Sequence, residues 1–389
     1  MIGGQAIDTI PLAFYLQKNF EILILSGEKE NNEVEANFLE QKYSSVLIKK
    51  IHFFKRSINP FNDVIAFFKI KSEIKKFGCD IIHTHGAKPG VIGRLAGKMC
   101  GVKCLVHTFH GHLFHSYYNN FVSDFLVRTE RRLSNFSDKI IAISNSQKEE
   151  LVNKYKVADE KKIAVIQLGV DENVLNDEAA CKRKLFREKY LIDNSCIAIG
   201  IAGRLVAIKN CCMFINVAGE LLKTQKRSIK FFIIGDGVLR KKLEKYCGEK
   251  HIKYNAAKDN FEKADLIFTS WIAESSNYLH GLDIVALTSN NEGTPLSLIE
   301  AQMCGKPVIA TNAGGSSDTF INNETGFLVE KNNDSEFCNK LQQLINDDTL
   351  RYNMGQNAKK SAVENFSKEK EVQHLAALYN ELLNKKEIN

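Results

Sequence analysis

The stretch that decides the fold is NNEGTPLSLIEAQMCG, Asn290 to Gly305. Residues 283–288 precede it and carry no charge after the first residue, so we expect a buried strand there. Thr294 is the expected N-cap of the following helix, Pro295 suits its first position, and Gly305 ends it. A strand followed by a glycine turn and a helix N-terminus predicts a site for a phosphate or a sugar oxygen.

Two carboxylates frame this turn. Glu292 lies before the expected helix, and Glu300 lies about one and a half turns into it. Beside an anion site, we interpret the two side chains as groups that hold hydroxyls. The alternative is a surface loop with two solvated glutamates. The mutual agreement of strand, turn and capped helix favours a site.

The spacing Glu-x7-Glu, with Gly-Thr-Pro after the first glutamate, resembles that of the retaining glycosyltransferases of family 4, which have the GT-B fold. The resemblance implies that Glu292 is catalytic and that it holds the donor sugar and phosphate with the amides after it. It also implies that the second glutamate holds the ribose hydroxyls of a nucleotide. The donor-binding residues implied here are Gly293, Thr294, Pro295, Leu296, Ser297 and Glu300.

A second charged motif follows the expected strand 197–202. Gly203 is followed by Arg204 and Lys209, and two fixed cations suit the two negative groups of a diphosphate. The motif resembles the Gly-Arg-Leu…Lys sequence of the same family, which makes Arg204 and Lys209 expected catalytic residues. Surface salt bridges are the alternative for both side chains.

Two more strand ends are expected to contribute to donor binding. Gly235 again follows a predicted strand. The segment 266–271 resembles the family's strand whose end holds the nucleobase by main-chain groups. Ser270 stands where the family usually has glycine, and Trp271, the only tryptophan, follows it. For Trp271 a place in the core remains an equal alternative.

The N-terminal residues are expected to form a glycine turn that opens a helix over 6–18. In the family a first strand precedes such a Gly-Gly turn, which packs near the donor diphosphate, so the resemblance implies donor contacts for Gly3 and Gly4. That strand is absent here. Either the natural start lies upstream or the sheet lacks an inner strand. A plain helix-start turn is the alternative for the two glycines.

Six of the ten histidines lie between His83 and His115. A metal site is not expected, because no carboxylate or cysteine accompanies them at a usual zinc spacing. The segment 107–115 resembles the family's His-Gly loop, which implies that His110 touches the donor sugar. A structural, hydrogen-bonded His110 is the alternative.

A chain of 389 residues is too long for one core, and its strands alternate with helices. We therefore predict an α/β protein with two doubly wound Rossmann-like domains facing a central cleft, as in GT-B folds. The expected parts are an acceptor-binding domain over 1–171, a linker over 172–194, a nucleotide-sugar-binding domain over 195–365, and a C-terminal helix over 366–389 that crosses back to the first domain.

The composition, 44% hydrophobic and 25% charged, is ordinary for a soluble protein. We see no apolar run long enough to span a membrane and no signal peptide. The ten cysteines form no CxxC pair, which indicates reduced thiols in a cytoplasmic protein.

The net charge of +7 lies mostly in the first half: residues 1–175 carry 24 basic and 19 acidic residues, hence +5, against 29 and 27, hence +2, in the rest. An anionic membrane surface is therefore an expected partner. Nucleic acid is disfavoured, because no recognition motif accompanies the charge. The helix expected over 63–77 is basic and apolar, and an ordinary amphipathic surface helix is its alternative.

Together these features predict a retaining, metal-independent glycosyltransferase without a cofactor other than its donor. It would move a hexose or N-acetylhexosamine from a nucleotide-sugar, expected to be a UDP-sugar, to a lipid-linked glycan in cell-surface polysaccharide biosynthesis. The expected location is the cytoplasm, on the inner face of the membrane. A sugar-nucleotide epimerase of the same fold and a non-catalytic nucleotide-sugar-binding protein are the alternatives.

Overall fold

The structure is a computed structural model that describes residues 4–28, 37–111, 120–255 and 261–388. It divides into two compact units. Unit 1 comprises Met1–Gly169 together with Lys368–Asn389, and unit 2 comprises Val170–Ser367. The chain thus passes between the units twice, and its last helix belongs to unit 1.

Unit 2 contains a six-stranded parallel sheet in the order β12-β11-β10-β7-β8-β9. Its central strands are nearly continuous apolar runs, such as IAIGIA in β7, because helices cover both faces of the sheet. The strands are β7 (Ile197–Ala202), β8 (Ile229–Ile234), β9 (Leu266–Ser270), β10 (Ile284–Leu287), β11 (Val308–Thr311) and β12 (Gly326–Val329).

Two helical layers bury the faces of this sheet. One layer packs α9, α10 and α13 on one face through Phe214, Leu243 and Phe337. The other packs α8, α11, α12 and α14 on the opposite face. The helices are α7 (Glu172–Asn176), α8 (Ala179–Lys189), α9 (Cys211–Thr224), α10 (Arg240–Glu249), α11 (Ser276–Leu279), α12 (Leu296–Met303), α13 (Asp334–Asn346) and α14 (Asp348–Phe366), with 3-10 turns at Ala207–Lys209 and Gly314–Asp318. The order of the strands reverses between β7 and β10, where doubly wound sheets bind their ligands.

The segment predicted as a linker, 172–194, is an integral part of unit 2. Its helix α8 places Phe186 in the core, and Tyr190 and Ile192 follow it there. The buried guanidinium of Arg187 donates to Asp283 at 3.1 Å. The high charge of this segment suggested a linker, but its apolar side chains and Arg187 fasten it to the sheet.

Unit 1 has two parallel sheets, β1-β2 and β3-β4-β5-β6. Within the described ranges no strand joins β1 to β3. The strands are β1 (Leu23–Gly27), β2 (Leu47–Ile51), β3 (Ile81–His85), β4 (Cys104–Phe109), β5 (Lys139–Ala142) and β6 (Ile163–Val165).

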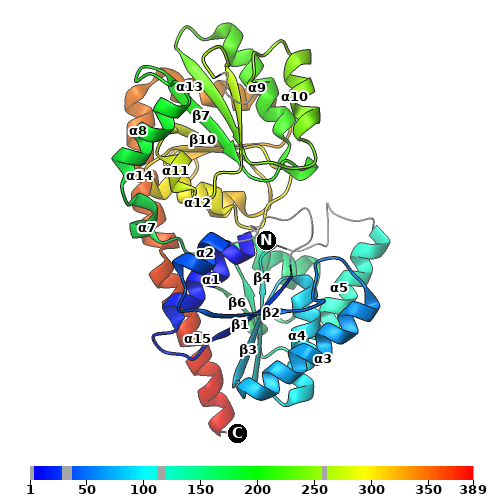
Figure 1. Ribbon diagram of the computed structural model, residues 1–389. Helices are drawn as coiled ribbons and strands as arrows, with labels where there is room; N and C mark the ends of the chain where they lie inside the picture. The colour runs from blue at the N-terminus through cyan, green and yellow to red at the C-terminus, as the bar shows by residue number, and fades with distance from the viewer. Residues whose placement is uncertain (1–3, 29–36, 112–119, 256–260, 389) are drawn as a thin grey trace. The chain divides into compact units, whose positions relative to one another are not determined.

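The helices of unit 1 include α15, the last of the chain, which lies against α1 (Figure 1). Leu12 and Leu16 of α1 share a core with Leu375 and Leu378 of α15. The helices are α1 (Gly4–Leu16), α2 (Asn37–Lys42), α3 (Pro60–Phe77), α4 (Ala87–Cys100), α5 (Asn120–Ser134), α6 (Asn145–Glu149) and α15 (Lys368–Ile388), with a π-helical turn at Glu150–Lys154 and a 3-10 turn at Glu160–Lys162. No helix in the described part of the chain is both long and apolar enough to cross a membrane.

Candidate functional site

The carboxyl edge of the unit 2 sheet gathers most of the predicted site residues. Gly203 follows β7, Gly235 follows β8, and Ser270 ends β9, while Glu292 lies in the loop after β10. Because the strands are parallel, their carboxyl ends lie along one edge. Gly203 and Glu292 follow the two strands, β7 and β10, between which the strand order reverses.

Close backbone packing explains two of these positions. A Cβ atom on Gly235 would lie 2.0 Å from the carbonyl oxygen of Gly203, and Gly235 has φ 129°. Any other residue at Gly235 would force the two loops apart. Ser270 has φ 59°, in the left-handed region that favours glycine. Its backbone conformation is therefore one that glycine adopts more readily.

An ion pair joins the loop after β7 to the loop after β10, the two strands between which the strand order reverses. Lys209 Nζ lies 2.6 Å from Glu292 Oε1, and Ser289 Oγ donates to the same oxygen. The backbone also holds the two loops together, since the Asn290 amide donates to the carbonyl of Ile208 at 2.8 Å. Lys209 is thus a positioned cation at the carboxyl edge.

Arg204, which follows Gly203 in the chain, is exposed. Within the described part of the chain, its guanidinium makes no ion pair or hydrogen bond. The predicted alternative, a surface salt bridge, is therefore not what the structure contains for Arg204. The side chain is a cation available to an anionic ligand.

Helix α12 begins one residue later than predicted. Pro295 is its N-cap, not Thr294, and no side chain caps the helix. The Leu298 amide bonds to the carbonyl of Pro295 at 3.0 Å. The amides of Leu296 and Ser297 have no partner within a helix that starts here, because the first turn of any α-helix leaves its N–H groups free. They are donors for an anion.

Glu300 lies in the second turn of α12. Ser275 Oγ donates to its Oε1 atom at 2.9 Å. Burial raises the pKa of Glu300 to about 7, and the hydrogen bond from Ser275 acts in the opposite direction. Glu300 therefore has a second carboxylate oxygen that Ser275 does not engage, and it titrates near neutral pH.

Sequence reasoning missed the residues that hold this site in shape. Ser289 and Ser275 fix the two glutamates, and no motif distinguishes them from other serines. Arg240 of α10 donates to Ser270 Oγ at 3.3 Å and lies over the Phe268 ring. Trp271 is 37% exposed, so the core alternative does not hold for this side chain.

Of the residues predicted in unit 1, His110 lies at the carboxyl end of a strand. Gly4 begins α1, whereas Gly3 lies outside the described residues. His110 follows β4 and shares a 2.7 Å hydrogen bond, between its Nε2 and Nδ1 of His85. Burial lowers the pKa of both rings, that of His85 to about 3, so the pair is neutral at pH 7.

A buried charge cluster near this histidine pair was also missed. Lys368, the first residue of α15, lies 2.8 Å from Asp8 Oδ1 and 2.6 Å from Glu371 Oε2. Glu371 also accepts from the Gly169 amide at 2.9 Å. The cluster thus joins α1 to Gly169, where the chain leaves unit 1, and to Lys368, where it returns. Asp8 and Lys368 are 360 positions apart, so no local pattern predicts their contact.

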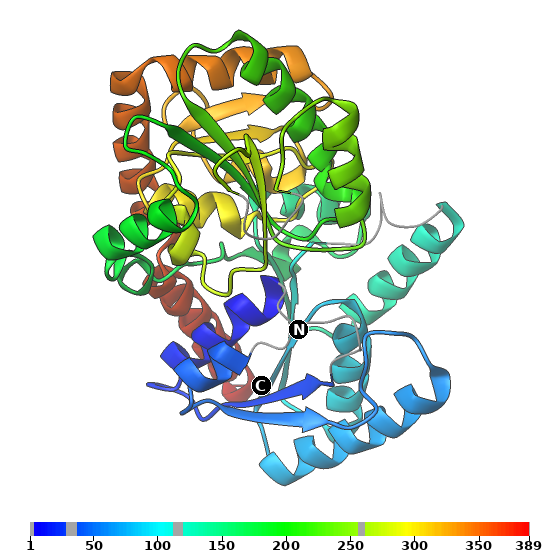
Figure 2. The ribbon, with the colours of Figure 1, turned by 45° about the horizontal axis from the view of Figure 1, so that its top comes forward.

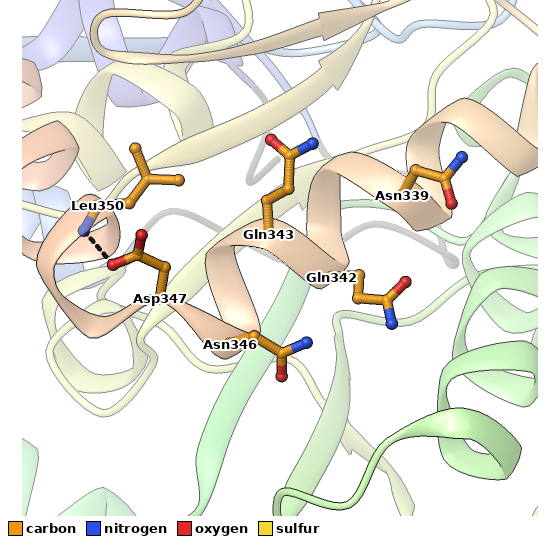
Figure 3. A pocket seen from close by; sticks show the side chains of 6 residues that line it. All are labelled: Asn339, Gln342, Gln343, Asn346, Asp347 and Leu350. Atoms are coloured by element: carbon orange, nitrogen blue, oxygen red, sulfur yellow. Dashed lines mark hydrogen bonds between the residues drawn. The ribbon is translucent and has the colours of Figure 1, made fainter.

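No group of three or more His, Cys, Asp or Glu in the described ranges is arranged to hold a metal ion. His112 and His115 of the histidine-rich segment lie outside those ranges. A separate hollow lies along α13 and the start of α14, and none of its lining residues belongs to the predicted site (Figure 3). It is lined by Asn339, Gln342, Gln343, Asn346, Asp347 and Leu350.

Comparisons with known proteins agree with this arrangement. Residues 2–174 match the family model described as Glycosyltransferase Family 4, and residues 182–361 match the one described as Glycosyl transferases group 1. The chain is 31% identical over 327 residues to the Escherichia coli enzyme UDP-Gal:alpha-D-GlcNAc-diphosphoundecaprenol alpha-1,3-galactosyltransferase, covering 83% of this chain and 81% of that protein. It is 25% identical over 377 residues to the capsular polysaccharide biosynthesis glycosyltransferase CapM of Staphylococcus aureus, covering 97% and 94%.

Solved structures share the fold along the whole chain. HepE of Anabaena, in its complex with UDP and glucose, has a TM-score of 0.77 at 19% identity, over 98% of this chain and 97% of that one. Sucrose-phosphate synthase of Thermosynechococcus elongatus has a TM-score of 0.81 at 18% identity, over 98% and 94%. The predicted GT-B fold, with two Rossmann-like domains, is confirmed. The chain belongs to the family 4 glycosyltransferases.

Proposed function

We propose that this protein transfers a hexose or N-acetylhexosamine, with retention, from a UDP-sugar to a lipid-linked glycan during polysaccharide assembly. The observation that carries the proposal is the Lys209–Glu292 ion pair at the strand switch, beside the uncapped N-terminus of α12. The name of the E. coli relative supports the donor and acceptor classes, because it specifies a UDP-sugar and a diphosphoundecaprenol-linked sugar. The complex of HepE with UDP and glucose supports the donor class too.

The proposed chemistry depends on charge that grows on the leaving diphosphate. As the bond from the anomeric carbon to the diphosphate oxygen breaks, Lys209, Arg204 and the amides of Leu296 and Ser297 would stabilise the negative charge. The acceptor hydroxyl would attack from the same face of the sugar and pass its proton to the diphosphate. Glu292 would hold sugar hydroxyls while its ion pair fixes its orientation.

The remaining predicted contacts complete the donor site. Glu300 would bind the ribose hydroxyls through the oxygen that Ser275 leaves free, and main-chain groups at Ser270 and Trp271 would bind the base. His110, Gly3 and Gly4 remain predicted donor contacts that rest on the family resemblance alone. A lipid-linked acceptor would place the reaction at a membrane surface.

Replacement of Glu300 by glutamine should weaken UDP binding by about 1–2 kcal/mol, because charge-assisted bonds to the ribose hydroxyls become neutral ones. This equals roughly a 5- to 30-fold rise in Kd. In the wild type, UDP affinity should fall as the pH drops below about 7, since protonation removes the carboxylate charge. Calorimetric titration at pH 6 and 8 measures both effects.

The matched control is Glu324→Gln, an exposed glutamate of the same unit. It should leave the Kd and its pH dependence unchanged. A Glu300→Gln variant with wild-type affinity at pH 8 would remove Glu300 from the nucleotide site.

Transfer should survive the removal of divalent metal ions by EDTA. In the proposed scheme two cations and a helix N-terminus stabilise the charge of the diphosphate, so a metal would duplicate their role. Rates with and without an excess of chelator should agree within about twofold. A loss that Mg²⁺ or Mn²⁺ restores would show that the protein cations do not suffice.

A thermal-shift panel of UDP-, GDP- and ADP-sugars tests the donor proposal. Ligands that bind the folded state raise its melting temperature, so UDP-sugars should give the largest increase. An equal response to all three nucleotides, or none, would contradict the assignment of the donor. Product analysis separates the alternatives, because an epimerase would yield an altered sugar nucleotide without an acceptor, and a binding protein would yield no product.

A further inference from the structure

Three neighbouring helices of unit 1 are apolar on their outer as well as their inner faces. Helix α4 contacts both α3 and α5, and the three lie together on one side of the unit (Figures 1 and 2). The exposed apolar side chains of these three helices are Phe61, Val64, Phe68, Leu95, Met99, Phe121 and Phe125. The inner faces contribute to the cores in the usual way.

On α3 the outer side chains form one stripe. Phe61, Val64 and Phe68 are spaced i, i+3 and i+7, so they lie on the same side of the helix, and they are 76%, 55% and 60% exposed. The buried Ala66 and Ile70 lie on the opposite side. A surface helix of a soluble protein normally has polar residues where this stripe lies.

Helix α5 repeats the pattern. Phe121 and Phe125, 84% and 64% exposed, are one turn apart, and Arg128 and Arg132 continue the same side towards the C-terminus of the helix. Its buried side carries Val127 and, beyond it, Leu133. The outer stripe is therefore aromatic in its first half and cationic in its second.

The lysines and arginines of this face are not engaged in ion pairs with other described residues. Lys75 continues the stripe of α3, and Lys98 lies on the exposed side of α4. Within the described ranges, neither lysine has an ion-pair partner, and the same holds for Arg128 and Arg132. Asp124 is the one exposed acidic residue of α5. The face thus combines aromatic side chains with a net positive charge.

Helix α5 is firmly held, so its stripe has a defined position. The buried guanidinium of Arg94 in α4 lies 2.6 Å from Glu130 of α5. The exposed Arg131 donates to the carbonyl of Tyr155 at 2.6 Å and 2.9 Å. Neither contact involves a side chain of the outer stripe.

We propose that this outer face of α3, α4 and α5 docks on an anionic lipid bilayer. Phenylalanine rings insert at the boundary of headgroups and acyl chains, while lysine and arginine bind lipid phosphates, so the two kinds of side chain on one face match a bilayer. An acidic protein partner would match the cations but leave the aromatic stripes without a counterpart. The inference rests on the proposed function, because a lipid-linked acceptor is reached at a membrane.

Flotation with vesicles tests the proposal on the full chain. Wild-type protein should float with vesicles that contain about 30% phosphatidylglycerol at low salt, and much less with pure phosphatidylcholine, since the attraction of cations requires anionic lipid. The variants Phe61→Ser/Phe68→Ser and Phe121→Ser/Phe125→Ser should each lower the affinity by about tenfold or more. Arg128→Glu/Arg132→Glu should abolish the preference for anionic lipid.

The matched controls carry equal changes on unit 2. Leu185→Ser/Tyr352→Ser removes two side chains that are 60% and 66% exposed, and Lys184→Glu/Lys245→Glu reverses two exposed charges. Both controls should float as the wild type does. All variants should keep the wild-type melting temperature within about 2 °C, because their side chains lie in water.

Three outcomes would overturn the proposal. The first is a wild type that does not bind anionic vesicles at low salt, and the second is phenylalanine variants that bind as well as the wild type. The third is a dimer, seen by analytical ultracentrifugation, that the phenylalanine variants abolish, which would assign the face to a second copy of the chain. Vesicle binding without any thermal shift from nucleotide-sugars would leave the docking face intact and refute the proposed function instead.

Discussion

Replacement of Lys209 by alanine is expected to lower kcat/KM for sugar transfer by roughly 10²–10³-fold, or about 2.7–4 kcal/mol, the usual cost of losing one preorganised group that stabilises charge in a transition state. Lys209 is held by its ion pair with Glu292 and by the Thr288 hydroxyl, which donates to the Lys209 carbonyl at 3.1 Å. Because the charge on the diphosphate grows as the sugar leaves, the loss should appear mainly in kcat. Release of UDP, followed at saturating acceptor, measures it.

The control for Lys209 is Lys223→Ala, which removes an exposed lysine of α9 in the same unit. It should change kcat/KM by less than twofold. Since Lys209 and Glu292 are partly exposed, the loss of their ion pair should cost about 1 kcal/mol of stability or less. A Lys209→Ala variant that is folded and has wild-type kcat would refute the role of this lysine.

Replacement of Lys368 by methionine is expected to destabilise unit 1 by about 3–5 kcal/mol, because it leaves two buried carboxylates without their shared cation. In the wild type, burial would raise the pKa of Asp8, but Lys368 outweighs this effect and holds it below its ordinary value. Burial and the neighbouring Asp8 raise the pKa of Glu371. Denaturant unfolding measures the loss.

The loss should grow with pH. Without Lys368 the folded state binds protons at Asp8 and Glu371 more tightly than the unfolded state, so its stability falls as the pH rises. The wild type also loses some stability as Glu371 ionises, because its pKa is raised to about 8, but Lys368 offsets the charges of Asp8 and Glu371. The difference between the variant and the wild type should therefore be larger at pH 9 than at pH 5. A difference that shrinks towards pH 9 would contradict the assigned charges.

Lys386→Met is the control on the same helix, because Lys386 forms an ion pair with Asp138 at 2.9 Å but is 45% exposed. It should cost less than about 1 kcal/mol. Equal unfolding midpoints for the Lys368 and Lys386 variants would show that the buried cluster does not fasten α15 to unit 1.

The strands and glycine turns of unit 2 were predictable because their signals are local. A continuous apolar run, a turn and a helix with a C-terminal glycine follow one another within 283–305, and the motif after β7 has the same form. Parallel topology then brings Gly203 and Glu292 to one edge without further information. The one-residue error at the start of α12 is of the size that helix ends usually show.

Other features depend on contacts between distant residues and left no local signal. Charge made 172–194 resemble a linker, although Phe186 and Tyr190 belong to the core. The direction of Phe61 and Phe121 was equally hidden, since composition shows that aromatic residues are present but not that they face outwards. The basic charge of the first half indicated a membrane partner but not the surface that would contact it. The exposed stripes of α3 and α5 identify that surface.

The retention of configuration is the claim that one product structure tests most directly. The protein would be incubated with a UDP-α-sugar and a sugar-diphosphate-lipid acceptor, and the new linkage examined by proton NMR. Retention by same-face attack predicts an α-linked product, in which the anomeric proton is equatorial on a gluco- or galacto-configured ring and therefore has a small coupling constant to the proton on the neighbouring carbon. A β-linked product, or donor consumption without transfer to the acceptor, would contradict the proposed function.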